Sequence, residues 1–269
     1  MRRKWIGDNT VVPLLRTIAV TRYVTPLREG GSLPAIVEAD DEGMYVLKFR
    51  AAGHGAKALV AEVIAGEIGR ALDLPVPEIV LATLDRDLSR TEPDPEIHAL
   101  IHDSAGLNMA LDYLPGSVTF DPVVHAVAED FASKVVWFDA FVSNVDRTAR
   151  NSNMLMWHRK PWLIDHGSTL YFHHAPDWPV NARARSPFAA IKDHVLLRRA
   201  RHLRDVDKKM AATLTPDLVG AILGAVPGEW LEDADARLTA DQARDAYRRY
   251  LRERLEPPRE FVEEAARVR

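Results

Sequence analysis

The stretch Asn144-Val145-Asp146-Arg147-Thr148-Ala149-Arg150-Asn151 decides the fold prediction, because the chain changes character there. The apolar run before it opens at Asp121-Pro122, with Asp as N-cap and Pro at the first helical position, and predicts a long helix that extends to Ser143. Two short strands, 154–157 and 161–164, are expected after it. The polar stretch is therefore predicted to be a loop between a buried helix and a small hairpin.

The residues before this loop combine strands with one helix. Apolar and β-branched runs predict strands at 17–24, 35–39, 44–49 and 79–84, and the turn Asp40-Asp41-Glu42-Gly43 would make a hairpin of the second and third. Apolar residues at helical spacing predict a helix from Ala56 to Leu72. We expect an antiparallel sheet with one helix, and an exposed loop over the charged, proline-broken residues 85–96.

The residues after the loop and hairpin read as helices. Thr215-Pro216 and a capping box formed by Thr239 and Gln242 predict two helix starts, and Pro257-Pro258 separates the last two helices. This order predicts an α+β protein with two lobes. We assign residues 1–114 to a small N-terminal lobe built on an antiparallel sheet, and residues 115–269 to a larger helical C-terminal lobe.

Three polar side chains near the loop suggest phosphoryl transfer. Asp146 and Asn151 lie in the loop, and Asp165 follows the second strand of the hairpin. Such chemistry needs a carboxylate that orients the incoming hydroxyl group and oxygen ligands for magnesium. Asp146 suits the first role, while Asn151 and Asp165 suit the second. Asn153 competes with Asn151 for the metal, and any one of these residues alone could merely satisfy a turn.

A lysine in the N-terminal half completes the constellation. Alternation along the strand 44–49 puts Lys48 on the face opposite Leu47, where it could reach phosphates in a cleft. Glu62, near the middle of the following helix, could hold the Lys48 ammonium in place. Glu67 is the alternative partner, and a surface position for Lys48 is the simpler reading if no partner exists.

The order of these residues resembles the HipA-like kinases. That family has a loop of the form N-x-D-x-x-x-x-N, which this chain matches from Asn144 to Asn151, and the likeness covers roughly residues 28 to 175. It implies a two-lobed protein-kinase-like fold that uses ATP and Mg²⁺, with Asp146 as catalytic base and Asn151 and Asp165 as metal ligands. Lys48, supported by Glu62, would contact the nucleotide phosphates.

The resemblance also places a phosphate-covering loop at Gly30-Gly31-Ser32, with Ser32 as an autophosphorylation candidate. Two positions depart from the family pattern. Thr148 stands where histidine is usual in the bacterial toxins of the family, and His166 stands where ordinary protein kinases have phenylalanine. Neither change removes a magnesium ligand, but both leave the substrate class and the regulation open.

Composition narrows the remaining classes of function. The chain has no cysteine, which excludes disulfides and thiolate chemistry, and its net charge of −4 does not favour direct binding of nucleic acid. No apolar run is long enough to cross a membrane, so we expect a cytoplasmic protein without membrane contact. The basic segment 192–209 is either a docking face for an acidic or nucleic-acid-linked partner, regulatory partners included, or a solvated helix face.

The resemblance implies transfer of the γ-phosphate to a hydroxyl, with a protein serine or threonine as the acceptor. A small-molecule or lipid-like kinase is the alternative enzyme, and a catalytically silent nucleotide-binding module that signals to a partner is the alternative of another class. A metal hydrolase built on His166, His173, His174 and Asp177 is the weakest reading, because the sequence holds no helical pair of histidines at ligand spacing.

Overall fold

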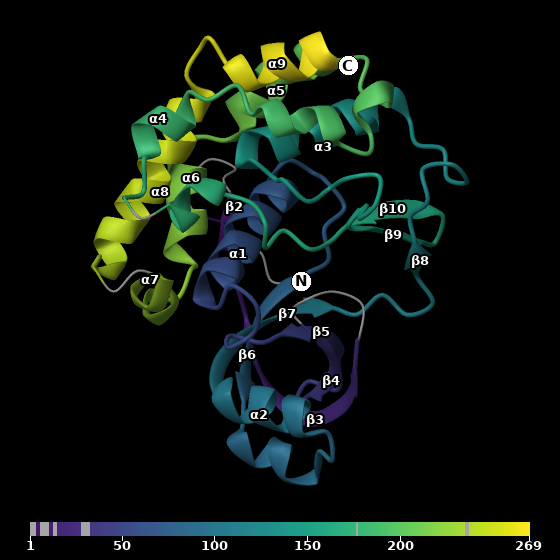
Figure 1. Cartoon of the computed structure of the whole chain (residues 1–269), viewed down its shortest axis with the longest axis vertical. Helices are drawn as coiled ribbons and strands as arrows, with labels where there is room; N and C mark the ends of the chain where they lie inside the picture. The colour runs from purple at the N-terminus through teal and green to yellow at the C-terminus, as the bar shows by residue number, and fades with distance from the viewer. Residues whose placement is uncertain (1–3, 6–10, 13–14, 28–32, 176, 235–236) are drawn as a thin grey trace.

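The computed structural model describes the whole chain except residues 1–3, 6–10, 13–14, 28–32, 176 and 235–236. A β-barrel lies at one end of the molecule and a group of helices at the other (Figure 1). Helix α1 (Ala56–Ala71) lies between them. None of the described helices has the length and apolar character that a membrane crossing requires.

The barrel contains five strands in the order β3-β4-β5-β7-β6, closed by pairing of β6 with β3. Their bounds are β3 Thr17–Pro26, β4 Ala35–Ala39, β5 Met44–Lys48, β6 Ile79–Leu84 and β7 Gly106–Asp112. The predicted β4–β5 hairpin is confirmed. Four of the barrel's five strand pairings are antiparallel, as predicted, but β3 and β6 pair in parallel, so the predicted antiparallel sheet is confirmed only in part. Five strands in a ring cannot alternate direction at every neighbour, so closure requires one parallel pair.

The interior of the barrel is a small apolar core. Tyr45 and Leu47 of β5 point into it, together with residues from the other strands, while Lys48 has the opposite orientation that alternation predicts. Helix α2 (Pro95–Asp103) packs Ile97 and Ile101 against this core. The loop predicted at 85–96 is not wholly irregular, because it contains a 3-10 helix, Arg86–Thr91, and the first residues of α2.

Helix α1 belongs by its packing to the core of the helical half. Its apolar residues lie in one continuous cluster with those of α3 (Glu129–Val142), and it also contacts α6 (Pro216–Gly224) and α7 (Gly228–Ala234). The same cluster includes Met109 and Leu111 of β7. The helix therefore connects the barrel to the helical half through buried apolar contacts.

Helix α3 begins later than the sequence suggested. Asp121 does not start a helix but closes a turn, in which its Oδ1 accepts a hydrogen bond from Val123 N at 2.8 Å. Val123 and Val124 are 92% and 73% exposed, so no buried face holds a helix together at this point. The helix starts only at Glu129, where acidic residues occupy its first turn.

The predicted hairpin after the polar loop is confirmed as β9 (Met154–Trp157) and β10 (Lys160–Leu163), joined by β8 (Val118–Thr119). The capping box at Thr239 and the cap at Thr215 are also confirmed. The other described elements are β1 Lys4–Trp5, β2 Val11–Val12, η2 Tyr171–His174, α4 Val180–Ala184, η3 Ala189–Asp193, η4 Leu197–Arg199, α5 Leu203–Thr213, α8 Ala240–Leu255 and α9 Glu260–Val268.

Candidate active site

Lys48 links the barrel to the residues that follow the hairpin. Its ammonium contacts Glu62 Oε1 and donates to Asp165 Oδ1 at 2.7 Å, and its side chain is only 11% exposed. Glu62 Oε1 also accepts a hydrogen bond from Gly167 N at 2.9 Å. Strand β5, helix α1 and the segment after β10 thus meet at one ion cluster.

Burial and charge act against each other in this cluster. Burial by itself would raise the pKa of Glu62, but the Lys48 ammonium and the neighbouring His166 ring together hold that pKa well below its usual range. Burial would likewise lower the pKa of Lys48, yet Glu62 and Asp165 raise it. Lys48 and Glu62 are therefore both charged at neutral pH, and the carboxylate of Asp165, 46% exposed, lies at the open side of the cluster.

The structure places Glu67, the alternative partner of Lys48, elsewhere. Its carboxylate lies 3.3 Å from Arg70 Nε on the same helix, and burial raises its pKa to about 7. Glu62 is thus the residue of α1 that lies against Lys48.

Asp146 accepts hydrogen bonds from both asparagines that the sequence offered as metal ligands. Its Oδ2 accepts hydrogen bonds from Asn151 Nδ2 at 2.9 Å and from Asn153 Nδ2 at 3.0 Å. The Asp146 backbone N–H donates to Asn144 Oδ1 at 3.0 Å. Both amide nitrogens therefore turn toward Asp146, so the amide oxygens of Asn151 and Asn153 face other directions.

A buried network beneath the loop was missing from the sequence prediction. Asp139 of α3 is fully buried and its Oδ2 accepts from Arg147 Nε at 2.6 Å and from His194 Nε2 at 2.9 Å. Its Oδ1 accepts from Asn144 Nδ2 at 2.8 Å. Burial would raise the pKa of Asp139, but Arg147 and His194 keep it well below its usual range. A lone carboxylate inside an apolar helix requires such partners, so the position of Asp139 in an apolar run is the sequence feature that could have predicted this network.

Arg147 ties the polar loop to the end of the hairpin. Its Nη1 contacts the carbonyl oxygen of Asn153 and lies 3.5 Å from that of Ile164. Ile164 N in turn donates to Asn153 O at 3.0 Å. Since Asp146 precedes Arg147 and Asp165 follows Ile164, these bonds hold the two carboxylates on adjoining segments.

Two of the site residues have left-handed backbone conformations. The φ angles of Asn153 and Asp165 are 45° and 57°, in the left-handed region that asparagine and aspartate enter more readily than other residues except glycine. Such a conformation persists where surrounding contacts fix the chain. Here the fixing contacts are those of Asp146 with Asn153 and of Lys48 with Asp165.

The two departures from the family pattern have structural explanations. Thr148 Oγ1 accepts from Asn151 N at 3.3 Å, and Thr148 N donates to Asn151 O at 2.9 Å, so threonine closes the loop locally. His166 is buried, with its ring edge-on to Phe138 at 5.7 Å between centroids and its Nδ1 3.7 Å from Glu62 Oε2. It therefore fills an apolar position beside the ion cluster.

The donor set suits a hard divalent cation. Asp165 accepts a hydrogen bond from Lys48 through one carboxylate oxygen, Oδ1. Asn151 and Asn153 bond Asp146 through their amide nitrogens, so their amide oxygens are not used in those bonds. Magnesium binds few protein oxygens and takes others from phosphate and water. Among the described residues no three His, Asp or Glu side chains group into a metal site, so the histidine-based hydrolase reading has no support.

The proposed phosphate-covering loop, Gly30, Gly31 and Ser32, lies outside the described residues. The other predicted residues form two adjoining groups, one of Lys48, Glu62 and Asp165 and one of Asp146 and Asn151.

Comparisons with known proteins concern the family and the fold. The model of the HipA-like kinase family matches residues 20–258. The Helicobacter pylori proinflammatory kinase CtkA superposes with a TM-score of 0.56 at 13% identity, covering 94% of this chain and 99% of that one, which shows a kinase-like fold. A Golgi casein kinase structure with Mn/ADP bound gives 0.48 at 11% identity, covering 93% and 73%. A search of curated proteins found no match.

Proposed function

The chain belongs to the HipA-like kinase family, and from that premise we propose that it transfers the γ-phosphate of ATP to a hydroxyl group in the presence of Mg²⁺. The observation that carries the proposal is the direct contact of Lys48 with both Glu62 and Asp165, three residues that lie far apart in the sequence. A kinase must bring such a lysine, glutamate and metal-binding aspartate together before it can act.

Each residue of the site has a role that its surroundings support. Lys48 binds nucleotide phosphates, and Glu62 fixes its position. Asp165 and Asn151 hold the metal, which when bound neutralises charge on the transferred group. Asp146 orients the acceptor hydroxyl and takes its proton, and the two amide donors on its Oδ2 keep that carboxylate in place.

The proposal extends to the two lobes, the phosphate-covering loop, the acceptor residue and the cellular location. We propose that residues 1–114 and 115–269 act as two lobes with the nucleotide between them, and that Gly30, Gly31 and Ser32 cover its phosphates. The acceptor is a protein serine or threonine, and the protein works in the cytoplasm. A small-molecule kinase or a silent nucleotide-binding module remains the competing function.

Labelled nucleotide tests the proposal. Purified protein is incubated with γ-labelled ATP, Mg²⁺ and host lysate, and the labelled products are identified. A labelled protein serine or threonine supports the proposal, a labelled small molecule favours the alternative enzyme, and nucleotide binding without label transfer favours the silent module. In a thermal-shift titration, Asp165→Ala weakens the stabilisation by Mg²⁺–ATP while Lys192→Ala leaves it unchanged; equal responses would count against the site.

A further inference from the structure

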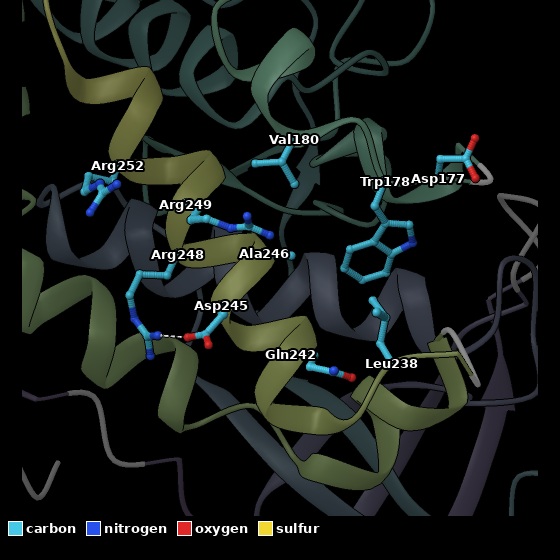
Figure 2. Close-up of a pocket in the computed structure, with 10 residues that line it drawn as sticks. All are labelled: Asp177, Trp178, Val180, Leu238, Gln242, Asp245, Ala246, Arg248, Arg249 and Arg252. Atoms are coloured by element: carbon cyan, nitrogen blue, oxygen red, sulfur yellow. Dashed lines mark hydrogen bonds and ion pairs between the residues drawn. The ribbon is translucent and has the colours of Figure 1, made fainter.

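A second site lies on the helical half, away from the ion cluster. A pocket of about 590 Å³ lies between the chain at Asp177–Val180 and helix α8 (Figure 2). This volume falls within the range of about 300–1,000 Å³ that is typical of ligand sites.

One wall of the pocket is apolar and rigid. Trp178 is 7% exposed, and its ring packs edge-on against those of Tyr247 and Phe172, at 5.2 Å and 5.8 Å between centroids. Val180 and Leu238 continue this wall. Because the aromatic contacts fix Trp178, the wall is formed before any ligand arrives, which lowers the cost of binding an apolar side chain.

The other wall carries three arginines of α8, of which two lie beside acidic side chains and one has no such partner in the described part of the chain. Arg248 pairs with Asp245, and Arg252 lies 3.7 Å from Glu253. Arg249 is exposed and, among the described residues, has no hydrogen bond or ion pair of its side chain. Figure 2 shows Arg249 extending along α8 toward Ala246, while the carboxylate of Asp177 points away from the helix. The pocket thus presents an unpaired guanidinium group next to an apolar wall.

This combination selects the chemistry of the ligand. A guanidinium group offers two parallel N–H donors that match a carboxylate, and the pair gains strength where apolar surface excludes water. The ligand should therefore carry an acidic group next to a large apolar one. Acidic side chains of a peptide satisfy both conditions when an apolar residue lies beside them.

Contacts at His173 fix the chain between the candidate active site and the pocket. Lys57 of α1 donates to His173 O at 2.8 Å, and the His173 ring bonds Tyr247 of α8 at 2.8 Å. In the sequence, His173 follows the proposed metal ligand Asp165 by eight positions and precedes Trp178 by five.

We propose that this pocket binds a segment of the acceptor protein in which an acidic side chain lies beside a large apolar one. The inference rests on the proposed kinase function and names a sequence feature that the acceptor carries. Arg249 holds the acidic group, and Trp178 with Leu238 receives the apolar side chain.

Two fluorescein-labelled peptide mixtures test the inference with the full chain. Both contain a central serine and randomised flanks, but one has Glu next to Phe and the other Lys next to Phe. Fluorescence anisotropy should show that the wild type binds the Glu mixture about fivefold more tightly or better. Arg249→Glu should abolish the preference and Arg249→Gln should reduce it. Arg198→Glu, which changes an exposed arginine outside the pocket, should keep it.

Equal affinity of the wild type for both mixtures, or an unchanged preference in Arg249→Glu, would overturn the pocket assignment. Label transfer from γ-labelled ATP to the same peptides separates the two proposals. Transfer without a preference that depends on Arg249 overturns the pocket and keeps the kinase. Binding that depends on Arg249 without any transfer keeps the pocket as an acidic-peptide site and overturns the kinase.

Discussion

Replacement of Arg147 by methionine should destabilise the protein and the site together. The side chains of Arg147 and Asp139 are both fully buried, with 2.6 Å between Nε and Oδ2. Removal of one partner from a buried ion pair costs about 3–5 kcal/mol, because the other charge stays buried. Asp139 would retain Asn144 and His194 as donors, which favours the lower end of this range. The carbonyl oxygens of Asn153 and Ile164 would each lose a charged donor.

The expected loss of about 3–5 kcal/mol corresponds to a fall in Tm of roughly 6–20 °C for a chain of this size. Urea unfolding followed by circular dichroism gives the free energy, and thermal scans give the Tm. Arg198→Met is the matched control, since an exposed arginine should change stability by less than about 0.5 kcal/mol. If Arg147→Met were as stable as Arg198→Met, the buried ion pair of Arg147 with Asp139 would not stabilise the protein as proposed.

The other predictions concern single groups. Lys48→Met should weaken stabilisation by Mg²⁺–ATP in thermal-shift titrations, whereas Lys192→Met should not. Asn151→Ala should raise the Mg²⁺ concentration needed for label transfer, while Asn153→Ala should mainly lower the Tm; the reverse pattern would make Asn153 the ligand. Burial and neighbouring cations lower the pKa of His174 to about 4, so the unfolded chain binds more protons below the ordinary value of 6.5. The Tm should therefore fall as pH falls from 7 toward 4, and less steeply in His174→Gln.

Local patterns predicted much of the barrel and the hairpin. The Asp40–Gly43 turn and the alternation of Tyr45 and Leu47 act between near neighbours, so the sequence displays them directly. Closure of the barrel depends on β6 meeting β3, a contact that no local pattern encodes. The start of α3 was misplaced for a related reason. The capping signal at Asp121 is real but serves a turn, because the valines after it have no core to face.

The candidate site was predictable where side chains have a defined chemical role. Lys48, Glu62 and Asp165 were chosen for what a nucleotide requires, and the structure brings them into contact. Asp139 and Arg147 were missed because their role is to support others: both are buried, and their partners become apparent only when α3 and the loop fold together. A charged residue in the middle of an apolar helix was the one signal available for Asp139.

If Asp146 takes the proton of the acceptor hydroxyl, Asp146→Asn should slow phosphoryl transfer while nucleotide binding is kept. Asparagine can keep an oxygen toward Asn151 and Asn153 but cannot take a proton from the acceptor. The measurement is the rate of label transfer from γ-labelled ATP to a protein acceptor, with thermal stabilisation by Mg²⁺–ATP as the control for binding. The rate should fall by about 10²–10⁴-fold with stabilisation retained. A rate within tenfold of the wild type, with the same stabilisation, would contradict this role of Asp146.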